Sequence, residues 1–121
     1  MIEQLEGFPD NVVAVAYRGK ISAKDYEEVL VPAVEKCLKD YGKIRVYAEI
    51  GSDLEGIDAG AAFEDFSVGM KNYTHWDRVA VVTDHDWIAN SVRFFSFMMP
   101  GEMKPFAPSD KAAAKQWIEA A

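Results

Sequence analysis

The run Val79-Ala80-Val81-Val82 is the feature of this sequence that most constrains its fold. A short strand that is apolar without alternation, here residues 78–83, is typical of a parallel sheet covered on both faces. Residues 43–50 form a second predicted strand, whose apolar residues alternate along one face. The sequence therefore favours a sheet with helices packed against it.

The N-terminal third predicts a hairpin followed by a helix. Residues 2–7 and 12–18 are rich in residues that favour strands, and turn-forming residues separate them. From an N-cap at Ser22, apolar residues recur at i, i+3 and i+4 until Gly42, which is the rhythm of an amphipathic helix. Pro32 has no backbone N–H, so we expect a kink or a break inside this helix.

A second helix is predicted in the middle of the chain. After the strand at 43–50 we expect a loop over residues 51–56 and then a helix capped by Asp58. The core stripe of this helix is Ala59, Ala62, Phe63, Phe66, Met70 and Tyr73. Trp76 is expected in the loop before the next strand, where it covers the sheet edge.

The remaining elements follow the strand at 78–83. Asp84 or Asp86 caps a third helix that runs to about Met99. An edge strand over residues 103–107 contains a proline, and Asp110 opens a final helix. The element order is ββαβαβαβα.

This order predicts an α/β fold with one domain over residues 1–121. Strands that alternate with helices imply a mostly parallel five-stranded sheet covered by four helices, with the hairpin adding one antiparallel strand. A chain of 121 residues suits a single domain, and its 50% apolar composition excludes a disordered chain.

Charge and cysteine content restrict the partners and the compartment. Lys and Arg total 13 against 20 Asp and Glu, giving a net charge of -7, so we expect no nucleic-acid partner. A lone cysteine, Cys37, and a start without a basic, apolar leader predict a cytoplasmic protein. No apolar run reaches the ~18 residues of a membrane span.

Three stretches carry a resemblance to a known family: residues 15–22, residues 44–50, and residues 78–84 leading into Trp87. With the element order, they make the chain resemble the sulfate-transporter and anti-sigma-factor antagonist (STAS) domain, and more closely its SpoIIAA-like bacterial branch. That branch is related in fold to the CRAL-TRIO lipid-binding domains. The resemblance implies a non-enzymatic binding module, and association with apolar ligands or membrane surfaces is a tendency of the group.

The third predicted helix carries more apolar side chains than one core face needs. With 100° between successive residues, four of its apolar residues fall on one stripe, which is expected to face the core. These residues are Ile88, Val92, Phe95 and Met99. A second stripe, centred roughly 120° away, consists of Trp87, Phe94 and Met98, and Phe97 widens it. Such an excess either packs under a neighbouring segment or forms a groove, a dimer interface or a membrane contact.

We therefore predict a module that binds an apolar or amphiphilic, lipid-like ligand, or associates with a membrane surface, through the helix at 86–99. The net negative charge requires hydrophobic insertion to drive any membrane contact. Arg93, His85 or Tyr73 could accept the carboxylate of an amphiphile. The residues of this predicted site are Trp87, Phe94, Phe97, Met98, Arg93, Phe66 and Tyr73. A homo-oligomer would also cover the apolar excess.

The alternative is an antagonist-like adaptor for a partner protein. In the antagonists, a serine in a loop of the type Asp-Ser-Ser-Gly is phosphorylated to switch partner binding. The matching stretch is Ile57-Asp58-Ala59-Gly60, which lacks the phosphorylatable serine. The residues of this alternative site are Ser52, Asp58, Ala59 and Glu64, in a segment without Lys or Arg.

Catalytic and metal sites are not predicted. Adjacent helical residues point about 100° apart, so Asp84, His85 and Asp86 cannot together hold one metal ion. No Gly-x-Ser-x-Gly elbow or phosphate-binding glycine motif occurs. Cys37 lies on an apolar helix face and is predicted to be an inert, buried thiol. We expect no cofactor; an enzyme using His85 and Asp84 is the third and weakest hypothesis.

Overall fold

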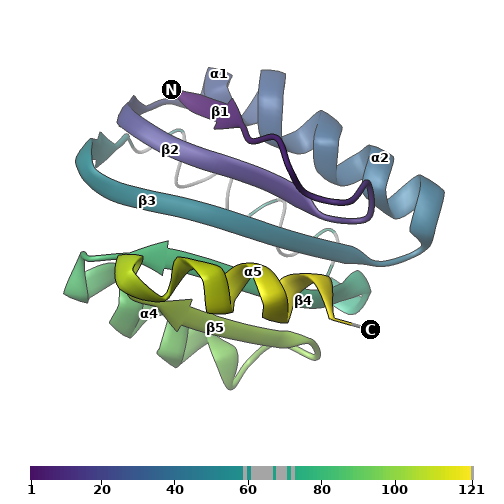
Figure 1. Ribbon diagram of the computed structural model, residues 1–121. Helices are drawn as coiled ribbons and strands as arrows, with labels where there is room; N and C mark the ends of the chain where they lie inside the picture. Colours follow the sequence, from purple (N-terminus) through teal and green to yellow (C-terminus); the bar gives the residue numbers. More distant parts are fainter. Residues whose placement is uncertain (59, 61–66, 68–70, 72, 121) are drawn as a thin grey trace.

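Five strands form one sheet in chain order, in a computed structural model that describes residues 1–58, 60, 67, 71 and 73–120 (Figure 1). The strands are β1 (Ile2–Gln4), β2 (Val13–Ile21), β3 (Ile44–Ile57), β4 (Trp76–Thr83) and β5 (Glu102–Phe106). β1 pairs antiparallel with β2, and every other pair is parallel. The predicted hairpin and the mostly parallel five-stranded sheet are confirmed.

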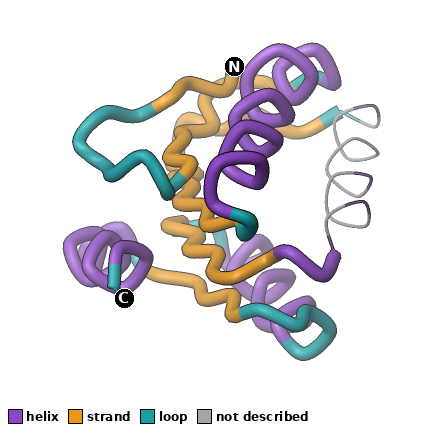
Figure 2. The backbone as a smooth tube through the Cα atoms, turned by 90° about the vertical axis from the view of Figure 1, so that its right-hand side faces the viewer, coloured by secondary structure: helices purple, strands orange, loops and turns teal. Residues whose placement is uncertain are grey.

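Helices cover both faces of the sheet (Figure 2). The α-helices whose bounds the structure describes are α1 (Ala23–Asp25), α2 (Val31–Tyr41), α4 (Asp86–Ser96) and α5 (Lys111–Glu119). Short 3₁₀ turns occupy Tyr73–His75 and Pro108–Asp110. α2 and α4 lie on one face and α5 on the other. The predicted helix after Asp58 lies mostly outside the described residues, although residues 60, 67 and 71 are helical. Of its predicted core stripe, only the backbone of Tyr73 is described.

Two hydrophobic cores follow from the alternation of side chains along the strands. The larger core joins one face of the sheet to α2 and α4, with Val15, Ile44 and Val34 fully buried. The smaller core lies under α5, where Ala80, Ala114 and Ile118 are fully buried. β3 and β4 contribute to both cores, which is why their sequences are apolar on both sides.

The helix after β2 begins and ends as the sequence predicts, and its α-helical geometry is interrupted just before Pro32. Ser22 is the N-cap, and its backbone N–H donates to Asp25 Oδ2 at 2.8 Å. Gly42 ends the helix with a φ of 74°. Between these ends the chain makes a π-helical turn at Tyr26–Leu30, and Pro32 lies in the first turn of α2. Pro32 has no N–H to donate to the preceding turn, so the regular α-helical bonding starts afresh in α2 after the π-helical turn.

The predicted loop at 51–56 is wrong, because β3 continues through it to Ile57. This extension pairs with the last residues of β2 after register shifts at Gly19. The positive φ angles of Gly19 and Gly56, 60° and 156°, allow the irregular backbone that this pairing requires. Trp76 is also not a loop residue, since it begins β4 and packs against the larger core.

Two arginines fix the C-terminal end of α5 to the sheet. Arg45 is only 5% exposed, and its Nη1 donates to the carbonyls of Ile118 and Ala120 at 2.9 and 2.6 Å. Arg78, its register partner on β4, donates to two carbonyls of the same region. Asp77 Oδ2 accepts from Arg45 Nε at 2.6 Å. The unpaired carbonyls at the helix end thus receive charged donors.

Candidate functional site

Helix α4 begins at His85, which is the N-cap with extended backbone. Its N–H donates to Thr83 Oγ1 at 3.1 Å, and its ring Nε2 lies 2.9 Å from the carbonyl oxygen of Gly51. Asp86 is the first helical residue and carries the acidic charge favoured there. The predicted caps, Asp84 and Asp86, are therefore wrong, because contacts with β4 and β3 place His85 at that position.

One side of α4 packs on the sheet as expected. Ile88 and Val92 are buried in the larger core, and Met99 packs against it. Phe95, predicted on the same stripe, is instead 50% exposed. The core therefore covers a narrower part of α4 than the periodicity indicates, and Phe95 joins the exposed side chains.

The rest of α4 and the turn after it expose five large apolar side chains. We call these five residues the α4 patch: Trp87, Phe94, Phe95, Phe97 and Met98, between 50% and 89% exposed. Phe97 is the most exposed, at 89%, and lies just beyond the last residue of the helix. With roughly 200 Å² for a large apolar side chain, the α4 patch offers on the order of 600 Å². That is the upper end for the largest patch of a typical monomer.

Polar side chains of α4 bond within the helix itself. Ser91 Oγ donates to the Trp87 carbonyl at 2.8 Å, and Ser96 Oγ donates to the Arg93 carbonyl at 2.6 Å. Arg93 Nη1 donates to Asn90 Oδ1 at 3.1 Å. Hydroxyls that are already hydrogen-bonded cost less to move out of water than free ones. The surface around the aromatic rings is therefore suited to an apolar contact.

Comparison with known proteins identifies the family of this chain. A family model described as SpoIIAA-like matches residues 12–119. The chain belongs to the SpoIIAA-like family. It is also similar to the crystal structure of an uncharacterized protein from the DUF3478 family with a SpoIIAA-like fold, from Shewanella loihica PV-4. That match has a TM-score of 0.69 and 27% identity, and covers 98% of this chain and 92% of the other. No curated protein matches.

Of the remaining predicted ligand residues of this SpoIIAA-like chain, the structure describes the side chains of Arg93 and His85. Arg93 is exposed on α4, whereas His85 is half-buried against Gly51. Phe66 lies outside the described residues, and only the backbone of Tyr73 is described. The carboxylate-binding mouth expected for an amphiphile therefore stays a prediction.

The predicted partner site is only partly described. Ser52 is exposed within β3, and so does not lie at a helix N-terminus. Asp58 follows that strand, and its N–H donates to the Ile21 carbonyl at 3.0 Å. Ala59 and Glu64 lie outside the described residues. The longer β3 therefore places Ser52 in a strand, and the partner site as a whole stays a prediction.

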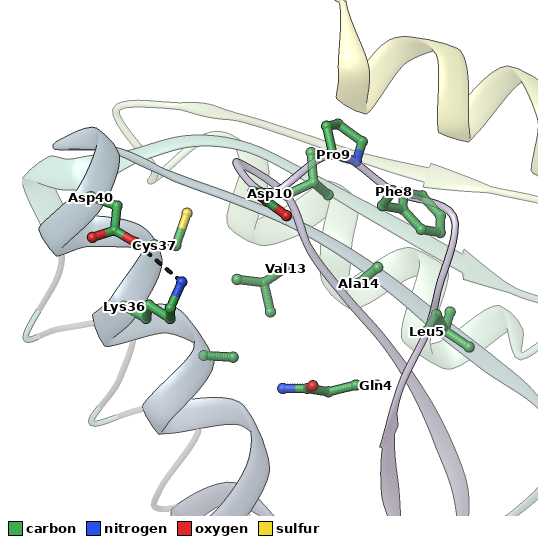
Figure 3. A pocket seen from close by; sticks show the side chains of 12 residues that line it. Gln4, Leu5, Phe8, Pro9, Asp10, Val13, Ala14, Lys36, Cys37 and Asp40 are labelled. Atoms are coloured by element: carbon green, nitrogen blue, oxygen red, sulfur yellow. Dashed lines mark hydrogen bonds and ion pairs between the residues drawn. The ribbon is translucent and has the colours of Figure 1, made fainter.

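Two of the hollows among the described residues are lined by elements other than α4. The larger, of about 230 Å³, lies between the β1–β2 loop and α2, with Phe8, Lys36 and Cys37 on its wall (Figure 3). The smaller, of about 170 Å³, lies at the carboxyl ends of β2 to β4, beside Glu49 and Lys111. Neither provides an enclosed apolar site for a lipid-like ligand next to the α4 patch.

Two groups that could take part in chemistry, the Cys37 thiol and the His85–Asp84 pair, lie among the described residues. Cys37 is buried, and burial raises the pKa of its thiol, so the structure is consistent with the predicted inert residue. His85 Nε2 lies 3.9 Å from Asp84 Oδ1. Within the described part of the chain, no three His, Cys, Asp or Glu side chains gather in a way that could hold a metal ion.

No helix in the described residues has both the length and the apolar character needed to cross a membrane.

Proposed function

We propose that this SpoIIAA-like protein is a non-enzymatic module that docks peripherally on a membrane surface through the α4 patch. The observation that carries the proposal is the exposure of four aromatic side chains and Met98 on one helix and the turn after it. Aromatic and aliphatic side chains that project from a folded surface can insert into the boundary between headgroups and acyl chains. Of the ligand forms predicted from sequence, surface docking is the one that these exposed side chains support directly.

The protruding side chains of the α4 patch favour a lipid surface over a second copy of the chain. Phe97 is 89% exposed and lies in the turn after the helix. A second copy would have to offer a surface of matching shape. A lipid surface needs no complementary shape, so a protruding patch is sufficient for it.

Vesicle sedimentation tests the proposal. We expect the wild-type protein to sediment with phosphatidylcholine vesicles and Phe94→Ala/Phe97→Ala to lose at least about tenfold in partitioning, which is ~1.4 kcal/mol. Both side chains are mostly exposed, so the double variant should fold normally, as checked by circular dichroism. Tyr41→Ala is the matched control, because it removes an aromatic side chain of 46% exposure from α2.

Two results would refute membrane docking. One is a wild-type protein that does not sediment with vesicles. The other is a dimer, seen by light scattering, that Phe94→Ala/Phe97→Ala converts to a monomer while vesicle binding stays absent. The second result would assign the α4 patch to a second copy of the chain.

A further inference from the structure

Basic side chains close to the α4 patch in sequence are directed to the opposite face of the sheet. Lys104 follows the patch on β5, but its Nζ lies 4.9 Å from the ring centroid of Trp117 on α5. Lys111, the first residue of α5, has its Nζ 3.0 Å from Glu49 Oε1. Since α5 and α4 cover opposite faces, neither lysine contributes its charge beside the α4 patch (Figure 2).

Two acidic residues and one basic residue remain beside the α4 patch, so the local charge is negative. Arg93 is the basic residue of α4, and it is held by Asn90. Asp84 and Asp86 are both exposed at the start of the helix. An anionic bilayer attracts a protein through clustered Lys and Arg near the surface, at about 1 kcal/mol for each. The α4 patch has no such cluster among the described residues, and the whole chain carries a charge of -7.

We infer that the α4 patch selects electrically neutral lipid surfaces of the phosphatidylcholine type, and that the aspartates beside it make anionic lipids weaken binding. This inference rests on the proposed membrane docking and specifies the lipid. Insertion of aromatic side chains supplies the attraction, because the local charges oppose an anionic surface. Repulsion between the exposed aspartates and anionic headgroups is screened by salt, since the Debye length falls from ~30 Å at 0.01 M to ~3 Å at 1 M.

The test compares vesicles of two compositions at low and high salt. We expect wild-type protein to bind pure phosphatidylcholine vesicles at least threefold more tightly than vesicles with one third phosphatidylserine, at low ionic strength. At 0.5 M salt the difference should fall below twofold. Binding that increases with phosphatidylserine, or that is indifferent to it at low salt, would overturn the inference and leave membrane docking itself intact. Absence of binding to both compositions would refute the docking proposal instead.

A pair of variants locates the repulsion. Asp84→Asn/Asp86→Asn should raise binding to the phosphatidylserine vesicles at least threefold and leave binding to phosphatidylcholine unchanged. Glu6→Gln/Glu27→Gln is the matched control. It changes the net charge equally at exposed positions near the β1 edge of the sheet, opposite β5 (Figure 1). An equal gain in both variants would overturn the assignment to the two aspartates.

Discussion

Asp77 is the residue whose charge holds the anchor of α5 in place. Burial alone would raise the pKa of Asp77, but the hydrogen bond from Arg45 and the positive charges of Arg45, Lys43 and Arg78 outweigh it, so the pKa lies below its usual value. A carboxyl group with a lowered pKa in the folded state contributes stability above its unfolded pKa of ~3.9. That contribution is lost as the pH falls through the lower pKa of the folded state.

Asp77→Asn is therefore expected to cost about 1–3 kcal/mol of unfolding free energy at pH 7, the range for hydrogen bonds to charged groups. The cost should shrink as the pH falls below ~4. There the Asp77 carboxyl of the unfolded wild-type chain takes up a proton, so the charge of Asp77 stabilises the folded wild-type protein less. Urea denaturation between pH 7 and pH 3 measures both quantities. Asp53→Asn, at an exposed ion pair 3.7 Å from Arg18, is the control and should change stability by less than about 0.5 kcal/mol. A pH-independent cost for Asp77→Asn would contradict the role given to its charge.

At the scale of elements, the connection between α4 and β5 depends on a close approach of two backbones. A Cβ atom on Gly101 would overlap the carbonyl oxygen of Trp76, and it would also lie 2.8 Å from that of Asp77. Backbone atoms cannot move aside as a flexible side chain does. Gly101 therefore lets the turn after the α4 patch pack against the start of β4.

Gly101→Ala is expected to destabilise the fold by about 1–3 kcal/mol, the usual cost of overpacking. Thermal denaturation followed by circular dichroism measures the effect. Glu102→Ala, at the next and exposed position, should change stability by less than about 0.5 kcal/mol. Equal stabilities of the two variants would show that the turn can move away from β4 without cost.

At the scale of the whole molecule, the two cores share one sheet, so they should unfold together. Trp76 packs against the larger core and Trp117 against the smaller one, which gives each core a fluorescent reporter. We expect variants that retain a single one of these two tryptophans, with the others replaced by phenylalanine, to unfold at the same urea midpoint. Coincident transitions are the mark of one cooperative domain. An earlier transition at Trp117 would show that α5 separates first, against the prediction of a single domain over residues 1–121.

The sequence alone determined the features that depend on neighbours along the chain. Side-chain periodicity gave the strands at β2 and β4, and Ser22 and Gly42 marked the ends of one helical segment, because capping and alternation act over a few residues. The same periodicity separated the buried Ile88 and Val92 from most of the α4 patch. The periodicity wrongly placed Phe95 in the core. A helical wheel gives the direction of each side chain around the helix axis, but it does not show how much of the helix the sheet covers.

Only the tertiary structure decided features that depend on distant segments. β3 extends to Ile57 because β2 offers it a pairing partner, although its glycines are typical of a loop. His85 became the N-cap through a contact with Gly51, 34 residues away. Lys104 and Lys111 make their contacts on the sheet face that α5 covers. Their distance along the sequence from the α4 patch therefore could not show that their charges lie away from it. Local patterns encode local geometry, whereas long-range packing decides which of the compatible arrangements buries the most apolar surface and pairs the most charges.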